Sequence, residues 1–296
     1  MATYNGAKYI DEQINSIINQ TLDDWTLIIS DDNSSDGTVS ILKKYEKSDS
    51  RIKVITSETN IGVVRNFEKL MNYAADYSYV MFCDQDDVWL NTKIETTYKA
   101  MKELEDAFPD EPVLVYCEKT EVDESLNKII TKNRKYSDTL SGLLAQNHIY
   151  GCTVMINHSL LNISKNIPYY IENHDYWLAL QASLFGRIKN IPSSLILYRQ
   201  HSNNITGGIS NHNLVSKIKK WSMINKYQKK TIEQNYLFCK ENEYINNEDI
   251  DNYLRMLSLK GLNRIMYALK IHLVRDSFLS TCRFYLNILN YENSKL

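Results

Sequence analysis

The sequence predicts an α/β fold, with a mostly parallel β-sheet, helices on both of its faces and a C-terminal helical region. Helical and strand-like segments alternate along the first half of the 296 residues, an order typical of parallel sheets. Polar clusters follow three of the strand-like segments, at 1–6, 30–36 and 84–87. Ligands of such sheets gather at the carboxyl ends of the strands, so we expect one nucleotide-sized ligand to touch all three clusters.

The alternation begins with isoleucines at helical spacing between residues 8 and 20. The segments that follow are a strand at 25–29, a helix that begins near residue 36, a strand at 52–56, a helix at 63–75, a strand at 77–83 and a helix at 91–108. Ser34, Ser35 and Asp36 are of the residue types that cap a helix N-terminus, and we assign Asp36 that role.

The second half of the chain follows a different pattern. It predicts strands at 113–117 and 151–156, a helix near 139–145, a helix at 174–186, and a pair of strands at 188–191 and 194–201. From about residue 213 the pattern is helical to the end. We therefore predict a first domain at 1–210 and a helical region at 211–296.

Composition excludes several classes of protein. The formal net charge of −2 gives no overall attraction to nucleic acid. The five cysteines are dispersed and none forms a CxxC pair, which argues against a disulfide framework and a zinc cage. No apolar stretch approaches the ~18–20 residues that a membrane span needs. We predict a cytoplasmic protein.

Three carboxylates, Asp84, Asp86 and Asp87, follow the strand-like run that ends at Cys83. Carboxylates this close repel one another unless a cation or water screens them. A solvated loop before a helix is one interpretation, but it accounts for one aspartate better than for three. We favour a Mg²⁺ or Mn²⁺ ion that shares its coordination sphere with substrate phosphates. Trp89 would then close the base of the site, or simply pack in the core.

Two classes of enzyme use such a loop. The D-x-D-x-V spacing of Asp84, Asp86 and Val88 fits a phosphohydrolase in which Asp84 is the nucleophile. In those proteins the motif follows the first strand, whereas here it follows about the fourth. In the other class, the metal holds a nucleoside diphosphate as it departs from a sugar.

Seven stretches, in chain order, carry a resemblance to a known family: MATYNGAKYIDEQINSIINQT, WTLIISDDNSSDGT, NIGVVRNF, CDQDDVW, GCTVMIN, NHDYWLAL and LYRQHSNNITG. Together they resemble a family 2 glycosyltransferase of the GT-A (Rossmann-like) fold, and the last three stretches are similar to its rhamnosyltransferase-like branch. The resemblance covers roughly residues 1–208.

The resemblance implies a nucleotide site. Its residues would be Ala2, Thr3, Tyr4, Asp32, Arg65 and Asp84. Asp32, rather than Asp31, would accept the N3–H of a uracil or thymine, and Arg65 would reach the pyrophosphate or a neighbouring aspartate.

The resemblance also implies a catalytic base, metal ligands and residues that contact the sugars. Asp175 would be the catalytic base, although a helix N-cap is the alternative for a residue that opens an apolar helix. The metal ligands would be Asp86, Asp87 and His201, with Asp86 favoured. Donor sugar or acceptor would contact Gly151, Cys152, Trp89 and Arg199, and Asn204 would shape the same loop as Arg199.

Two regions fall outside the resemblance. Family members carry several apolar residues before the stretch that corresponds to MATYNG, so we expect Ala2 to Tyr4 to be less firmly held here. The helical segment at 260–289 mixes apolar and basic residues. It could lie on a membrane surface, or pack on its own domain or on a second subunit in a homodimer.

We therefore predict a metal-dependent inverting glycosyltransferase. It would transfer a sugar, rhamnose by the branch it resembles, from a UDP- or dTDP-sugar to a growing bacterial surface polysaccharide, with a glycan or lipid-linked glycan as acceptor. The alternatives are a Mg-dependent phosphohydrolase with Asp84 as nucleophile, and a non-catalytic nucleotide-sugar-binding subunit of a polysaccharide assembly. The cytoplasmic location leaves open a peripheral contact with the inner face of the cell membrane.

Overall fold

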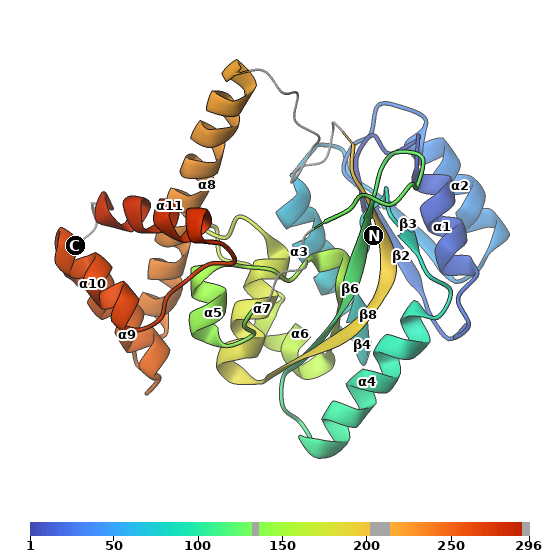
Figure 1. Cartoon of the computed structure of the whole chain (residues 1–296). Coiled ribbons are helices and arrows are strands. Elements are labelled where there is room, and N and C mark those ends of the chain that lie inside the picture. The colour runs from blue at the N-terminus through green and yellow to red at the C-terminus, as the bar shows by residue number, and fades with distance from the viewer. Residues whose placement is uncertain (132–135, 202–213, 292–296) are drawn as a thin grey trace. The chain divides into compact units, whose positions relative to one another are not determined.

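The computed structural model describes residues 1–131, 136–201 and 214–291 (Figure 1). These residues form two compact units. The first contains 1–131, 149–168 and 173–201, and the second contains 136–148, 169–172 and 214–291. The domain boundary near residue 210 stays a prediction, since the second unit also takes in two short segments that precede it.

A three-stranded, wholly parallel sheet begins the first unit. Its strands are β1 (Ala2–Thr3), β2 (Leu27–Asp31) and β3 (Ile52–Thr56), in the order β1-β2-β3. The helices between and after them are α1 (Ile10–Ile18), α2 (Thr38–Ser48) and α3 (Val63–Tyr73). The apolar side chains at helical spacing in α1, Ile10, Ile14 and Ile17, are buried. The alternation read from the sequence is confirmed here.

A five-stranded mixed sheet completes the first unit. Its strands are β4 (Tyr79–Met81), β5 (Val88–Trp89), β6 (Val113–Val122), β7 (Val154–Asn157) and β8 (Arg187–Arg199), in the order β4-β7-β6-β8-β5. Only β6 and β8 run parallel to each other. The antiparallel pairs are a feature that the alternation of helices and strands does not reveal.

The two strands predicted at 188–201 are one long strand, β8. Its pairing with β6 shifts register between Cys117 and Glu118, which lie opposite Ile191 and Ser194. The bulge accommodates Pro192, which cannot donate a ladder hydrogen bond. The strand therefore continues past a proline that, in the sequence, indicates the end of a strand.

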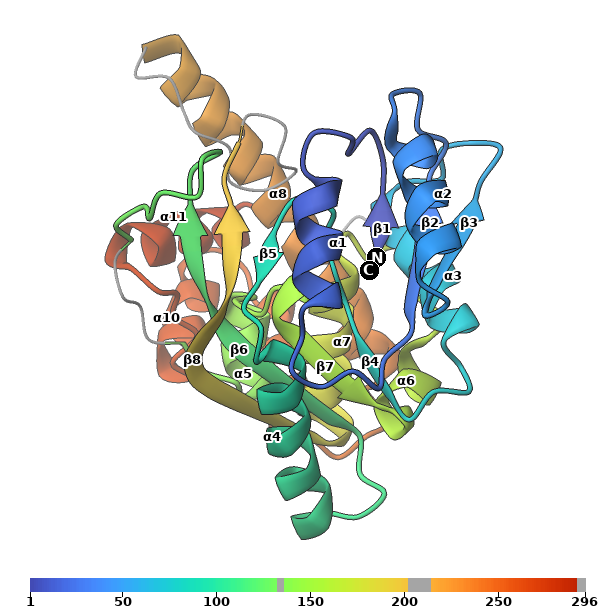
Figure 2. The same cartoon turned by 90° about the vertical axis from the view of Figure 1, so that its right-hand side faces the viewer.

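Helices cover both faces of the sheets, as predicted. In Figure 2, α4 (Lys93–Ala107) lies in front of β6 and β8, while α7 (His174–Phe185) lies behind them. The helix α6 (His158–Ser164) follows β7. Most side chains of α7 are buried, because this helix is apolar on nearly all sides. The 3₁₀ turn η1 (Gly151–Thr153) replaces the first half of the strand predicted at 151–156.

The second unit is helical in its described residues. Its helices are α5 (Leu140–Ala145), α8 (Leu214–Glu241), α9 (Glu248–Ser258), α10 (Leu262–Lys270) and α11 (Phe278–Leu289). The predicted C-terminal helical region is therefore present. In the described part of the chain, none of the helices is long and apolar enough to cross a lipid bilayer.

Candidate active site

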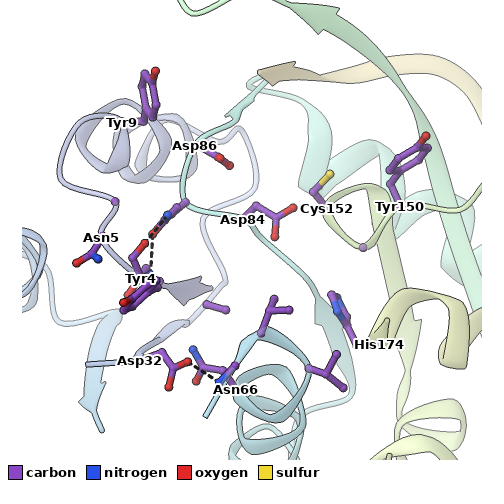
Figure 3. A pocket seen from close by; sticks show the side chains of 18 of the residues that line it. Tyr4, Asn5, Tyr9, Asp32, Asn66, Asp84, Asp86, Tyr150, Cys152 and His174 are labelled. Atoms are coloured by element: carbon purple, nitrogen blue, oxygen red, sulfur yellow. Dashed lines mark hydrogen bonds between the residues drawn. The ribbon is translucent and has the colours of Figure 1, made fainter. Parts of the chain in front are cut away.

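A cavity of about 680 Å³ opens at the carboxyl ends of β1, β2 and β4 in the first unit (Figure 3). All three polar clusters noted in the sequence contribute residues to it. Its lining comprises residues 2–6, 8–9, 32, 60, 62–64, 66, 84–86, 124, 150–152, 173–175, 198 and 201. The ends of these three strands therefore meet at one cavity, as predicted.

Asp32 lies at one end of this cavity, close to Asn66 (Figure 3). Its side chain is buried, and its two oxygens accept the backbone N–H groups of Ile61 and Gly62, each at 2.8 Å. Each carboxylate oxygen keeps a second lone pair for a ligand. Asp31, by contrast, is fully buried and accepts from Thr3 Oγ1, so it serves the structure of the loop.

Tyr4 and Gln85 tie the first loop to the aspartate loop. The Tyr4 N–H donates to Gln85 Oε1 at 2.9 Å, and Gln85 Nε2 donates to the Tyr4 carbonyl at 3.0 Å. A Cβ on Gly6 would lie 2.2 Å from Gln85 Oε1, so a larger residue here would displace this amide from its contacts with Tyr4. Ala2 and Thr3 line the cavity next to Tyr4. Gln85 was not predicted as a site residue, because it lies between two conspicuous aspartates, Asp84 and Asp86.

The three aspartates of the loop do not share one environment. Asp84 and Asp86 line the cavity, and burial raises the pKa of Asp84 to about 7, helped by the nearby charges of Asp86 and Asp175. Asp87 is fully buried outside the cavity lining and accepts the backbone N–H of Arg199 at 3.0 Å. Burial also raises the pKa of Asp87 well above its usual value.

Two arrangements of side chains could hold a cation. In the first, His201 Nε2 lies 2.8 Å from Asp86 Oδ2, and both residues line the cavity. The ring of Tyr9 stacks on the His201 imidazole, with 5.0 Å between the ring centroids. The ligand atoms of Asp84, Asp87 and Cys152 lie within 4.8 Å of one another. Carboxylate and imidazole groups are both ligands of such cations, and both residues of the first pair line the cavity. Of the second group, Asp84 and Cys152 line the cavity and Asp87 does not.

Asp175 occupies the first turn of α7 and lines the cavity. Its Oδ2 accepts the Gly151 N–H at 3.1 Å, and its Oδ1 accepts the Tyr176 N–H at 2.6 Å. Burial raises the pKa of Asp175 to about 6, against the lowering effect of these two N–H groups. Asp175 is not the N-cap residue of α7, because that position is occupied by Asn173.

His174 lies on the wall of the cavity opposite Asp32, near Tyr150 and Cys152 (Figure 3). Its ring stacks on Phe67 at 3.8 Å, and burial lowers its pKa to about 3, so the imidazole is neutral. A Cβ on Gly151 would lie 2.5 Å from His174 Nε2. Gly151 and Cys152 line the cavity, and their contact with donor sugar or acceptor stays a prediction. His174 was not predicted, because it reads as the first residue of a core helix.

Arg65 is placed away from the cavity lining, contrary to the prediction. Its Nη1 donates to the Ile167 carbonyl at 2.7 Å and pairs with Glu68 Oε2 at 2.6 Å. These contacts point the guanidinium along α3 toward the segment after α6. The motif set the position of Arg65 on the helix but not the direction of its side chain.

Trp89 and Arg199 also lie outside the cavity lining. Trp89 is buried in the core with Lys93 Nζ 3.8 Å from its ring centroid, as in the core-packing alternative. Arg199 is buried and its Nε donates to the Asp86 carbonyl at 2.8 Å, so it holds the aspartate loop instead of facing a substrate. Asn204 lies outside the described residues.

Comparison with known proteins identifies the family. Residues 1–162 match the family described as Glycosyl transferase family 2. The chain belongs to this family. The glycosyltransferase is 29% identical over 277 residues to the dTDP-rhamnosyl transferase RfbG of Shigella flexneri, an alignment that covers 88% of this chain and 91% of RfbG.

Solved structures identify the fold as GT-A. TarS of S. aureus, residues 1–349 in complex with UDP-GlcNAc, superimposes with a TM-score of 0.63 and 18% identity over 97% of this chain and 77% of that one. The mannosyltransferase PcManGT of Pyrobaculum calidifontis, in complex with GDP-Man and Mn²⁺, gives a TM-score of 0.57 and 14% identity over 96% and 77%. The predicted family and fold class are confirmed, and the phosphohydrolase alternative gains no support.

Proposed function

We propose that this family 2 glycosyltransferase transfers a sugar, rhamnose in our proposal, from a UDP or dTDP donor to a bacterial surface polysaccharide, with inversion at the anomeric carbon. The observation that carries the proposal is the single cavity that joins Asp32 at one end to Asp86, His201 and Asp175 at the other. A buried carboxylate beside a base subsite suits a donor with an N3–H, which uracil and thymine have.

The donor would lie along this cavity. Its base and ribose would contact Ala2, Thr3, Tyr4 and Asp32, and its diphosphate would lie by Asp84 and Asp86. Without a cation, the carboxylates would repel the diphosphate. Asp86 and His201 would hold Mg²⁺ or Mn²⁺ there, and the cation when bound would supply positive charge to the departing diphosphate. Asp84 and Asp87 are the next candidates for metal ligands.

Asp175 would be the general base. Its carboxylate takes the proton of the acceptor hydroxyl as the hydroxyl oxygen bonds to C1 of the donor sugar. The bond between C1 and the diphosphate oxygen breaks in the same displacement, and the nucleoside diphosphate leaves. The raised pKa of about 6 suits a group that must hold a proton briefly near neutral pH.

Two comparisons support the choice of donor. RfbG is named as a dTDP-rhamnosyl transferase, and TarS was solved with UDP-GlcNAc. A dTDP- or UDP-sugar donor agrees with both names. The proposed acceptor is a glycan or a lipid-linked glycan. The proposed location is the cytoplasm, at the inner face of the membrane where a lipid-linked acceptor would be reached.

Thermal unfolding tests the donor site directly. The purified chain would be melted with UDP, dTDP, GDP and CMP, each with and without Mn²⁺, because a ligand that binds only the folded protein raises Tm. We expect a manganese-dependent rise with UDP or dTDP alone, and loss of the preference over CMP in the Asp32→Asn variant. Equal shifts with all four nucleotides would contradict the assignment of Asp32.

Transfer is tested separately from binding. Incubation with dTDP-rhamnose or UDP-sugars and an undecaprenyl-linked glycan should release the nucleoside diphosphate in proportion to the glycan extended. Donor binding without transfer to any such acceptor would favour the non-catalytic nucleotide-sugar-binding subunit.

A further inference from the structure

Two tyrosine rings, those of Tyr150 and Tyr198, lie together on the wall of the candidate active-site cavity. Their ring centroids are 5.7 Å apart, with 53° between the ring planes. Tyr198 is buried, whereas Tyr150 keeps 38% of its surface exposed. The proposed donor and metal sites use neither ring. An aromatic ring exposed on a cavity wall suits a ligand that has an apolar face.

Lys119 supports both rings. Its Nζ lies 4.3 Å from the centroid of the Tyr150 ring and 4.2 Å from that of the Tyr198 ring, a favourable position for a cation. The β-sheet explains this arrangement. Glu121 of β6 lies opposite Tyr198 of β8, and Lys119, two residues earlier on β6, places its side chain on the same face. Lys119 does not line the cavity, so its ammonium lies behind the two rings.

Tyr150 is adjacent in the chain to a contact of the proposed catalytic base. It precedes Gly151, whose backbone N–H donates to Asp175 Oδ2 at 3.1 Å. Tyr150 and Asp175 both line the same cavity. A sugar that stacks on the Tyr150 ring can therefore present a hydroxyl group to the Asp175 carboxylate.

The position of Tyr150 along the cavity favours the acceptor over the donor. In Figure 3, Asp84 lies between Tyr150 and Asp32. The base and diphosphate of the donor are proposed to occupy the part of the cavity from Asp32 to Asp84. In a single displacement, the acceptor hydroxyl approaches C1 from the side opposite the departing diphosphate. The acceptor would therefore lie at the Tyr150 end.

A pyranose ring matches this part of the cavity. Many hexoses have a ring face made of C–H groups, which packs on an aromatic ring, while their hydroxyl groups point outward to polar side chains. Lys8 and Glu124 line the cavity and offer such groups, with 2.5 Å between Nζ and Oε2. Glu124 follows the end of β6, and this end pairs with the end of β8 that carries Tyr198.

We propose that Tyr150, supported by Tyr198 and Lys119, is the platform on which the terminal pyranose of the acceptor stacks. The ring would select acceptor sugars that have an uninterrupted face of C–H groups, and would hold their hydroxyl group at Asp175. The inference rests on the proposed transfer reaction in one respect, because that reaction defines which sugar is the acceptor. Tyr150 makes and breaks no bond; it determines specificity.

Transfer kinetics with the undecaprenyl-linked glycan separate this platform from the donor site. The Tyr150→Leu variant removes the ring and Tyr150→Phe keeps it. We expect the KM for the glycan to rise ~10-fold or more in Tyr150→Leu and to stay within ~3-fold of the unaltered value in Tyr150→Phe. The KM for the donor should change little in either variant. Tyr73→Leu, at an exposed tyrosine of α3 outside the cavity lining, is the matched control.

Two kinetic results would overturn the proposal. A rise in the KM for the donor, with the KM for the glycan unchanged, would assign the Tyr150 ring to the donor sugar. Equal KM values for the glycan in Tyr150→Leu and Tyr73→Leu would show that the ring contributes nothing to acceptor binding. The Tm of each variant is measured alongside, so that a loss of folded protein is not mistaken for a loss of affinity.

Saturation-transfer NMR tests the platform without turnover. The probes are the methyl glycosides of glucose, N-acetylglucosamine and galactose, each added to the chain with UDP and Mg²⁺. For at least one probe, we expect saturation of the C–H protons of one ring face by the unaltered chain, Tyr150→Phe and Tyr73→Leu. We expect saturation ~5-fold weaker or less with Tyr150→Leu, since the aromatic contact is lost.

The NMR outcomes also distinguish this proposal from the proposed function. No saturation of any probe, or equal saturation by Tyr150→Leu and Tyr150→Phe, would overturn the platform. Saturation of one ring face that depends on the Tyr150 ring, in a chain that transfers no sugar, would support the platform and contradict the transfer reaction instead.

Discussion

The Asp175 carboxylate accepts the Gly151 backbone N–H, with 3.1 Å between Oδ2 and N, and so ties the first turn of α7 to the turn before β7. This bond fixes where the carboxylate points. It also moderates the effect of burial, which raises the pKa of Asp175 to about 6. The group is therefore ionised at neutral pH yet basic enough to accept a proton.

The pH dependence of transfer follows from this value. Because Asp175 must be deprotonated to act as a base, we expect kcat/KM to fall about tenfold per pH unit below about pH 6. The profile would be measured with saturating Mn²⁺, and manganese affinity would be measured at each pH as the control. A rate that stays constant down to about pH 5 would contradict a base with this pKa.

The Asp175→Asn variant should separate activity from stability. We expect the transfer rate to fall by ~10²–10⁴ while donor binding is retained. The native pKa lies above the ordinary value of 3.8, so ionisation destabilises the fold as the pH rises through this range. A neutral amide removes that effect, and Tm at about pH 8 should be equal or higher. Transfer at the rate of the unaltered chain would remove Asp175 from the mechanism.

Gly151 should tolerate no side chain. The Cβ of Gly151→Ala would approach His174 Nε2 to 2.5 Å, in a region where burial leaves little room to relax. We expect a loss of ~1–3 kcal/mol in the free energy of unfolding, and a lower transfer rate as Asp175 is displaced. Gly37→Ala is the matched control, since its Cβ meets only Ala7 Cβ at 3.8 Å. Equal stability of the two variants in urea would show that the turn adapts.

Arg199→Lys should loosen the aspartate loop. The guanidinium of Arg199 donates to the Asp86 carbonyl and pairs with Glu12, and an ammonium cannot make both contacts with the same planar geometry. Because Arg199 is buried, we expect ~1–3 kcal/mol lower stability together with weaker manganese-dependent binding of UDP or dTDP. Weaker donor binding at unchanged stability would instead indicate direct contact with the substrate.

The sequence predicted best those features that depend on the backbone path. The three polar clusters meet because the carboxyl ends of β1, β2 and β4 lie together, and Asp32 and Asp86 reach one cavity from them. Asp175 reaches the same cavity from the first turn of α7. Strand order was harder to predict, because β8 continues through Pro192 by a bulge and pairs in parallel with β6. The mixed second sheet could therefore not be read from the alternation.

Side-chain direction explains the remaining errors. Arg65 turns to the Ile167 carbonyl, and Trp89 turns into the core. Both choices depend on segments that are distant in sequence. Gln85 and His174 were missed for the complementary reason: each contacts residues far along the chain, Tyr4 for the first and Gly151 for the second. A motif fixes which residue is present but not what it faces.

The proposed metal site can be tested without any transfer assay. Asp86 and His201 form the pair that faces the cavity, so Asp86→Asn should weaken Mn²⁺ binding by ~10-fold or more and should reduce the manganese-dependent rise in Tm with UDP or dTDP. Asp76→Asn, an exposed aspartate in the turn before β4, is the control for the loss of one charge. Binding would be followed by the electron paramagnetic resonance signal of free Mn²⁺. The Asp87→Asn variant decides between the two arrangements. A larger loss of Mn²⁺ affinity in that variant than in Asp86→Asn would place the ion among Asp84, Asp87 and Cys152.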